Sequence, residues 1–244
     1  MSSTTVRRMR RAAGRPIADL HECRPSIGLQ VQPTGRAPAA DSCSRGEFWR
    51  KLLHIAPGFL AFLLPFVPHA TPLGMQSLLE LTAITALLTG IYIAARRFVA
   101  RPGESDFLLT ALSYPAAVLA TLFVFPQAPE LAAVVVVVLA FGDGSAYIAG
   151  KRIGGPSLPW NVKKTWAGTI AFIAVAGPLA TIAYLGATDP ATPWLAGLAC
   201  GVGAALVAAV AESLPTRLTD NIRVGVAAAV TAATLHFGMA RWWA

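Results

Sequence analysis

Charged residues are scarce in this chain of 244 residues. Asp, Glu, Lys and Arg together make up 13% of the sequence, whereas a soluble domain contains about 25%. Hydrophobic residues reach 55%, and the mean hydropathy is +0.57. The surface of a soluble globular domain usually carries more charged residues than this chain contains. The composition therefore indicates an integral membrane protein.

Cysteine is also sparse. The three cysteines are Cys23, Cys43 and Cys200, and no two of them have CxxC spacing. Neither a disulfide framework nor a zinc site is expected from this spacing.

A hydrophobic run is missing from residues 1–44, which are rich in Arg, Pro and Ser. We expect these residues to form a disordered basic tail. They lack the apolar core of a secretory signal, so no such signal is expected. Residues 45–244 are expected to form one transmembrane domain.

Apolar segments of membrane-spanning length fill this second part. A spanning helix needs about 20 residues, and seven segments qualify: 52–68, 75–95, 106–125, 130–150, 166–187, 192–211 and 222–240. The first is short and interrupted by prolines. The prediction is an all-α, polytopic transmembrane bundle of about seven helices. The valine run 134–138 is expected to face lipid, and the Gly197-xxx-Gly201 pair to mark close helix packing.

The basic residues are distributed unevenly among the segments between these spans. With the N-terminus in the cytoplasm, nineteen of the twenty Lys and Arg residues lie on the cytoplasmic side, and Arg241 is the exception. Basic residues are enriched in cytoplasmic loops of membrane proteins. The net charge of +8 is therefore attributed to topology and not to nucleic-acid binding. The cytoplasmic side is also where nucleotides occur.

Asp143 lies near the cytoplasmic end of an apolar segment, within the stretch "FGDGSAYIAGKRIGG". A carboxylate at membrane depth is costly unless it faces a wet or paired site. Gly142 and Gly144 would let a ligand approach the backbone closely. Asp143 is thus a candidate metal ligand or base. The alternative is an interfacial aspartate paired with Lys151.

Four cations follow Asp143 in a single loop. Lys151 and Arg152 are candidates for stabilising a transferred group, although cations at this face often determine topology alone. Lys163 and Lys164 directly precede Thr165, a candidate N-cap of the next helix. Together with the first-turn residues Gly168 and Thr169, they predict a phosphate cradle at a helix N-terminus.

The stretch "AESLPTRLTDN" provides a second acidic group on the same side. Glu212, Asp220 and Asn221 offer hard oxygen ligands suited to Mg²⁺ carried by a nucleotide. The alternative is a polar turn with Asp220 as an N-cap. Near the first span, "RGEFWRKLLHIAPG" contains Lys51 and His54. His54 is either catalytic or an ordinary polar residue at a helix end.

Three motifs in order resemble the polyprenol kinase family, which includes dolichol kinase, phytol kinase and CTP-dependent diacylglycerol kinase. They are "RKLLHIAPG", then "GDGSAYIAGKRIG" with "KKTWAGTIAF", and finally "AESLP" with "DN". The family is related to the phosphatidate cytidylyltransferases. The resemblance covers the chain from about residue 46 to the end. It departs from the family pattern at Arg223, which interrupts the start of the last span.

This resemblance implies phosphoryl transfer from CTP to the hydroxyl of a lipid alcohol: phytol, geranylgeraniol, dolichol or another polyprenol, or diacylglycerol. The family's central aspartate matches Asp143, its nucleotide-binding segment matches Lys163 to Thr165, and its late acidic pair matches Glu212 and Asp220. Mg²⁺ would be held by Asp143 and Asp220 with help from Asn221 or Glu212, and Asp143 or Asp220 would accept the hydroxyl proton.

Two alternatives have different chemistry. A phosphatidate cytidylyltransferase would make CDP-diacylglycerol and release pyrophosphate, but its longer acidic and basic run near the C-terminus is not evident. A transporter would be expected to carry inverted repeats and polar groups near mid-membrane, and here the polar groups gather at one face. The expected partners are a lipid alcohol, a nucleotide and membrane lipids. The sequence gives no oligomeric state.

Overall fold

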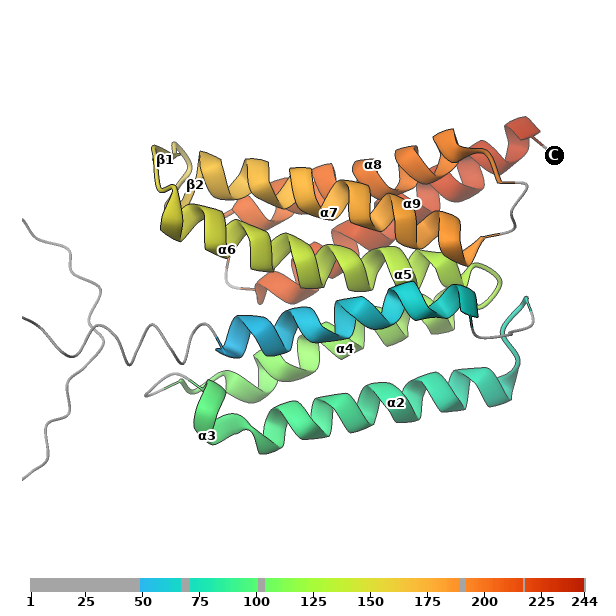
Figure 1. Cartoon of the computed structure of the whole chain (residues 1–244), viewed down its shortest axis with the longest axis horizontal. Coiled ribbons are helices and arrows are strands. Elements are labelled where there is room, and N and C mark those ends of the chain that lie inside the picture. Colours follow the sequence, from blue (N-terminus) through green and yellow to red (C-terminus); the bar gives the residue numbers. More distant parts are fainter. Residues whose placement is uncertain (1–48, 67–70, 101–103, 189–191, 217, 244) are drawn as a thin grey trace, which may run out of the picture. The chain divides into compact units, whose positions relative to one another are not determined.

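The computed structural model describes residues 49–66, 71–100, 104–188, 192–216 and 218–243. The predicted tail, with Cys23 and Cys43, lies outside the described residues. Within them the chain is almost entirely helical (Figure 1). Residues 49–55 are α-helical and continue into the 3-10 helix η1 (Ala56–Phe66). Next come α2 (Met75–Ala94), the short α3 (Arg96–Val99) and α4 (Phe107–Val124).

The second half of the chain contains the longest helices. α5 (Pro129–Val137), the π-helical turn η2 (Val138–Gly142) and α6 (Asp143–Arg152) form one continuous rod. The two-stranded antiparallel sheet of β1 (Ser157–Leu158) and β2 (Asn161–Thr165) follows. The chain then forms α7 (Trp166–Ala187), α8 (Trp194–Ser213) and α9 (Asp220–Trp243).

Six helices of the described residues are long and apolar enough to cross a membrane: Met75–Ala94, Phe107–Val124, Pro129–Arg152, Trp166–Ala187, Trp194–Ser213 and Asp220–Met239. These match six predicted spans, and the protein is a multi-pass membrane protein. The remaining predicted span, 52–68, is not among the six. Its described residues, 52–66, belong to the shorter helix that ends in η1, where Pro57 and Pro65 each lack a backbone N–H for helical hydrogen bonding.

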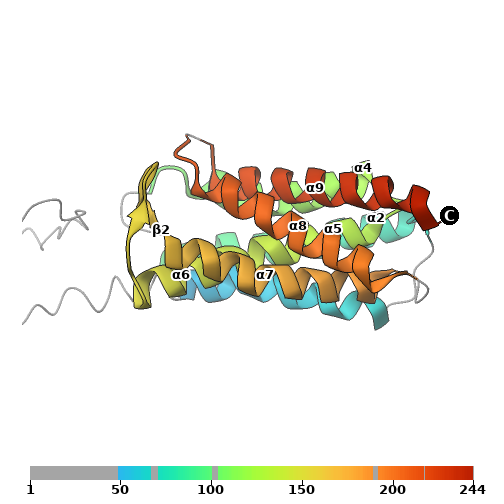
Figure 2. The same ribbon diagram turned by 90° about the horizontal axis from the view of Figure 1, so that it is seen from above.

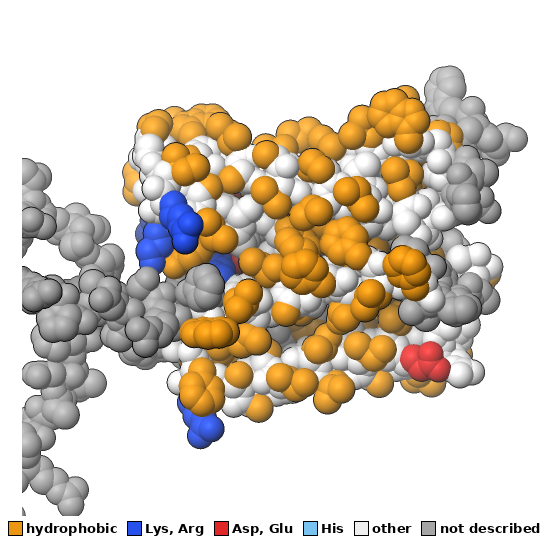
Figure 3. All heavy atoms as spheres, viewed as in Figure 1, with side chains coloured by type: hydrophobic (Ala, Val, Ile, Leu, Met, Phe, Trp, Pro, Cys, Tyr) orange, Lys and Arg blue, Asp and Glu red, His pale blue; other side chains and the backbone are white. Residues whose placement is uncertain are grey.

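The core lies where the α5–η2–α6 rod packs against α7, α8 and α9. Val134, Val135, Val137 and Val138 are fully buried there. The expectation that this valine run faces lipid was therefore wrong: a uniformly apolar helix can also lie at the centre of a bundle. α2, by contrast, has no buried residues. Hydrophobic side chains cover much of the visible surface in Figure 3, and lysine and arginine gather at the end that carries the sheet.

Small residues allow the helices to approach closely. A Cβ at Gly201 would collide with the backbone of Thr181, and one at Gly197 with the side chain of Leu185. The predicted role of this glycine pair in close helix packing is confirmed.

The β1–β2 hairpin lies at one end of the bundle, between α6 and α7 (Figures 1 and 2). Gly154 and Gly155 precede it with φ angles of +64° and +89°. L-residues with side chains rarely adopt this left-handed conformation. The two glycines thus let the chain turn back at the end of α6 into the hairpin, where Lys164 of β2 lies beside the end of α8 and the start of α9.

Candidate active site

A continuous cavity of 1190 Å³ extends through the described part of the bundle. One end is polar and the rest is mainly apolar. The apolar part includes Leu60, Leu81, Ile84, Val118, Leu122 and Ala133. The polar end is lined by Lys51, His54, Asp143, Lys151, Lys163, Lys164, Thr165, Gly168, Thr169, Glu212, Asp220 and Asn221. A ligand with a charged head and a long apolar tail would find a matching environment for each part.

Ten of the thirteen site residues predicted from the sequence line this cavity. The exceptions are Gly142, Gly144 and Arg152. A Cβ at Gly142 would meet the ring of Phe172, and one at Gly144 the side chain of Ile55. Protein side chains therefore occupy the space that the sequence suggested for a ligand, and these glycines serve helix packing.

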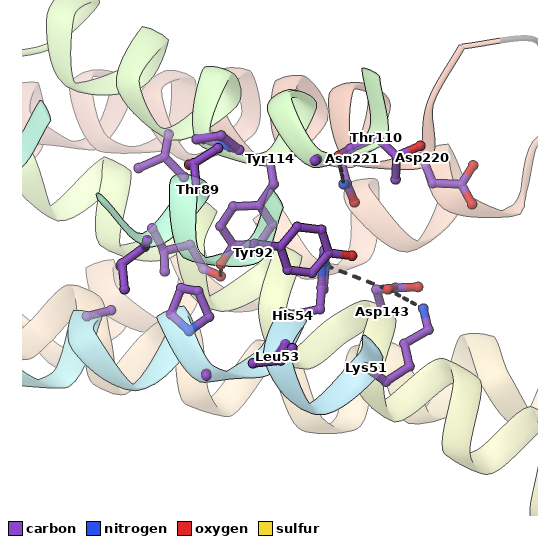
Figure 4. Close-up of a pocket in the computed structure, with 18 of the residues that line it drawn as sticks. Lys51, Leu53, His54, Thr89, Tyr92, Thr110, Tyr114, Asp143, Asp220 and Asn221 are labelled. Atoms are coloured by element: carbon purple, nitrogen blue, oxygen red, sulfur yellow. Dashed lines mark hydrogen bonds and ion pairs between the residues drawn. The ribbon is translucent and has the colours of Figure 1, made fainter. Parts of the chain in front are cut away.

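Asp143 begins α6 immediately after the π-helical turn η2. Such turns inside α-helices occur frequently at functional sites. The carboxylate forms an ion pair with Lys51, and its Oδ2 lies 3.7 Å from Nε2 of His54 (Figure 4). The expected alternative partner, Lys151, instead donates to the hydroxyl of Tyr147 at 3.2 Å. The carboxylate thus faces the cavity together with Lys51, which lies 92 positions earlier in the chain, and with His54.

Lys164 forms the second charged group of the cavity. Its ammonium pairs with Glu212 at the end of α8 and lies 3.4 Å from Oδ2 of Asp220 at the start of α9. Burial alone would lower the pKa of Lys164, but the carboxylates of Glu212 and Asp220 outweigh burial and raise it. Lys164 therefore stays charged at neutral pH.

The N-terminus of α7 is open to the same cavity. Thr165 is its N-cap, as predicted, and its hydroxyl accepts a hydrogen bond from the backbone N–H of Gly168 at 3.2 Å. The hydroxyl of Thr169 donates to the Thr165 carbonyl at 3.3 Å. Free N–H groups at such an end attract anions. Lys163 is exposed in β2 at the cavity edge.

The start of α9 is fixed by contacts that the sequence did not reveal. Asp220 pairs with Arg223, whose guanidinium also donates to the carbonyls of Ala211 and Leu214 at 2.6 Å each. Arg223, which departs from the family pattern, therefore ties α9 to the end of α8. Asn221 donates to the Thr110 carbonyl of α4 at 3.2 Å.

The hairpin is anchored to the end of α8 as well. Nε1 of Trp160 donates to the hydroxyl of Ser213 at 3.1 Å, and the amide of Asn161 donates to the Ser213 carbonyl at 3.0 Å. No sequence signal pointed to these residues, because tryptophan and serine near a loop have many other uses. The two bonds hold β2, and hence Lys164, in register with Glu212.

The carboxylates do not form a metal cluster by themselves. Within the described residues, no group of three or more His, Cys, Asp or Glu side chains could hold a metal ion. Asp143, Glu212 and Asp220 are each paired with a lysine or arginine. The donor set thus suits a metal ion that brings further ligands with it, since Mg²⁺ is usually held by one or two carboxylates together with substrate phosphates.

Comparison with known proteins finds related kinases. Phytol kinase 1, chloroplastic, of Arabidopsis thaliana is 29% identical over 213 residues, which is 78% of this chain and 66% of the relative. Farnesol kinase, chloroplastic, of the same plant is 30% identical over 201 residues, which is 74% of this chain and 63% of the relative. A probable phytol kinase 2, chloroplastic, of Oryza sativa subsp. japonica is 31% identical over 199 residues, which is 72% of this chain and 62% of the relative.

The aligned part of the chain thus spans slightly less than two thirds of the length of these curated relatives. No family model matches the chain, and no solved structure matches it. The chain is similar in sequence to the phytol and farnesol kinases over about three quarters of its length.

Proposed function

We propose that this protein is a membrane kinase that transfers the γ-phosphoryl group of CTP to the hydroxyl of a prenyl alcohol. The observation that carries the proposal is the continuous cavity that joins a charged end to a long apolar part. The names of the related kinases supply the alcohol class, and the resemblance to polyprenol kinases supplies CTP.

The apolar part would hold the prenyl tail. Along the α5–η2–α6 rod, the cavity is lined from Pro129 to Asp143, a span of about 20 Å at the helical rise of 1.5 Å per residue. That length covers much of the hydrocarbon core of a bilayer, which is about 30 Å thick. The alcohol would enter from the membrane beside α2, the helix without buried residues.

The charged end would hold the triphosphate. Lys163 and Lys164 would neutralise phosphate oxygens, and the N–H groups near Gly168 and Thr169 would donate to them. Lys151 would stabilise charge on the transferred group, in preference to Arg152, because only Lys151 of these two lines the cavity.

Magnesium would enter with CTP as part of the substrate. Asp220, with a side chain 49% exposed, would offer a carboxylate oxygen to such an ion, and Glu212 and Asn221 line the cavity nearby. When bound, the ion would neutralise negative charge on the phosphates.

The transfer itself requires a base and an aligned nucleophile. The hydroxyl oxygen attacks the γ-phosphorus, the bond from that phosphorus to the β–γ bridging oxygen breaks, and CDP leaves. Asp143 accepts the hydroxyl proton, while Lys51 stabilises the charged form of this carboxylate. Positioning and charge stabilisation supply most of the catalysis in such reactions.

The charged end is assigned to the cytoplasmic side. Nineteen of the twenty Lys and Arg residues fall on that side in the predicted topology, in agreement with the positive-inside rule. CTP would then reach the cavity directly from the cytoplasm.

The proposal is tested by incubating the purified, detergent-solubilised protein with γ-labelled CTP, Mg²⁺ and a panel of prenyl alcohols. We expect label in the organic phase as a prenyl monophosphate, with CDP as the other product. Lack of labelled lipid with every alcohol would contradict the proposal. Release of pyrophosphate on addition of phosphatidate would instead identify a cytidylyltransferase.

A further inference from the structure

His54 has a buried nitrogen without a hydrogen-bond partner. Its side chain is 14% exposed, and Nε2 is shielded from solvent and makes no hydrogen bond with the described residues. Buried polar atoms in native proteins nearly always have a partner. An unpaired nitrogen that belongs to a cavity-lining residue is therefore a candidate ligand-binding group.

The surroundings of His54 fix the position of its ring. The ring packs edge-on against Tyr114 with the centroids 4.9 Å apart. The Tyr114 hydroxyl donates to the carbonyl of Val136 at 3.1 Å, so Tyr114 is itself held against the central rod. In Figure 4 the His54 side chain lies between Tyr114 and Asp143.

His54 also lies at the border between the two parts of the cavity. Lys51, three residues earlier in the same helix, belongs to the charged end, and Pro57 and Leu60, on the next turns, belong to the apolar part. A polar group bound at His54 would therefore direct an attached apolar chain away from the lysines.

The distance to Asp143 indicates what fits at this point. Nε2 of His54 and Oδ2 of Asp143 are 3.7 Å apart, which is too long for a direct hydrogen bond. One oxygen atom placed beside both can hydrogen-bond to each. An ionised carboxylate only accepts, whereas a hydroxyl carries one proton and also accepts. A hydroxyl that donates to Asp143 can therefore accept from an Nε2–H group.

We propose that His54, as the tautomer with its proton on Nε2, and Asp143 together bind the hydroxyl of the lipid alcohol: Nε2–H donates to the hydroxyl oxygen, and the hydroxyl donates to Oδ2 of Asp143. The identity of the alcohol rests on the proposed function. In this arrangement the hydroxyl proton points at the proposed base, and a lone pair of the oxygen remains available for the γ-phosphorus. His54 is then a substrate-binding residue that selects an alcohol terminus.

The test compares binding of a prenyl alcohol with binding of its deoxy analogue, in which a methyl group replaces the CH₂OH terminus. Both compounds compete for a labelled prenyl alcohol on the purified full-length protein. In the unaltered protein we expect the alcohol to bind about tenfold more tightly than the analogue. In His54→Phe the preference should fall to about threefold, because the donor is lost while Asp143 still accepts from the hydroxyl.

A conservative variant separates binding from folding. The amide of His54→Gln can donate in place of the imidazole and should restore part of the preference, and it carries the test if His54→Phe does not fold. His236→Gln is the matched control, because His236 bonds to Tyr184 and does not line the cavity. This control should keep the full preference.

The outcomes separate this inference from the proposed function. Unchanged preference for the alcohol in folded His54→Phe and His54→Gln would overturn the role of His54, even if the unaltered protein phosphorylates prenyl alcohols. Preference that depends on His54, in a protein that transfers no phosphoryl group, would uphold the hydroxyl site and overturn the kinase assignment.

Discussion

Nζ of Lys164 in β2 lies 3.4 Å from Oδ2 of Asp220 at the start of α9, although 56 positions separate the two residues. The same ammonium pairs with Glu212 at the end of α8. One side chain thus connects the hairpin to two helices and contributes positive charge to the cavity. Its contribution to stability can be measured by substitution.

Loss of Lys164 alone should destabilise the fold. Lys164→Met leaves the carboxylate of Glu212, which is 4% exposed, without its main partner, and removal of one member of a buried pair costs about 3–5 kcal/mol. The double variant Lys164→Met/Glu212→Leu should recover most of this loss, because an apolar pair of similar volume replaces the ion pair. Thermal unfolding in detergent measures the stability of the single and the double variant. Equal destabilisation of the single and double variants would contradict the expectation.

The same lysine predicts a pH dependence of stability. The pKa of Lys164 in the folded protein is raised above its ordinary value of 10.5, so the folded state holds its proton more tightly than the unfolded state. This stabilisation is complete below pH 10.5 and is lost as the pH rises through the folded pKa. The unfolding temperature should therefore fall more steeply in this alkaline window for the unaltered protein than for the double variant. Parallel curves of unfolding temperature against pH for the two proteins would contradict this prediction.

Asp143 is predicted to be required for turnover but not for insertion. Asp143→Asn keeps the size of the side chain and removes the base and the negative charge beside Lys51. The rate of phosphoryl transfer should fall by about 100-fold or more, the range typical of lost general-base catalysis. Assays with labelled CTP measure the rate, and chromatography in detergent checks that the variant is folded. Normal turnover by the folded variant would remove Asp143 from the mechanism.

Local signals predicted six of the helices, the N-cap at Thr165 and most residues of the charged end, because span length and capping depend on neighbouring residues. Contacts between distant segments were not predictable. The pairing of Asp143 with Lys51, and not with Lys151, depends on how the first described helix packs on α6. The roles of Gly142 and Gly144 depend likewise on the neighbours Phe172 and Ile55.

The length of the apolar part of the cavity should set the length of the accepted prenyl tail. Leu81 lines this part and lies about 16 Å along α2 from Tyr92, which lies near the charged end. Leu81→Trp should reduce the affinity for geranylgeraniol about tenfold or more and affect geraniol little, since each buried methylene contributes about 0.8 kcal/mol.

The control for this change lies on the same helix. Leu87 is 64% exposed and does not line the cavity, so Leu87→Trp should leave the chain-length preference intact. The ratio of kcat/KM for the two alcohols is the measurement. An equal effect of both tryptophans, or none from Leu81→Trp, would place the tail elsewhere.

Thr165 combines a capping role with a position in the region proposed to bind the nucleotide, and three substitutions distinguish the two. Thr165→Ala removes the hydroxyl that accepts from Gly168 and should cost about 1 kcal/mol of stability. Thr165→Ser and Thr165→Asn keep an N-cap acceptor and should be close to the unaltered protein in thermal unfolding. If the cap acts by holding the N–H groups of α7 toward the phosphates, the KM for CTP should rise in Thr165→Ala and stay low in both other variants. A raised KM in Thr165→Asn with normal stability would instead indicate direct contact between the threonine hydroxyl and the nucleotide.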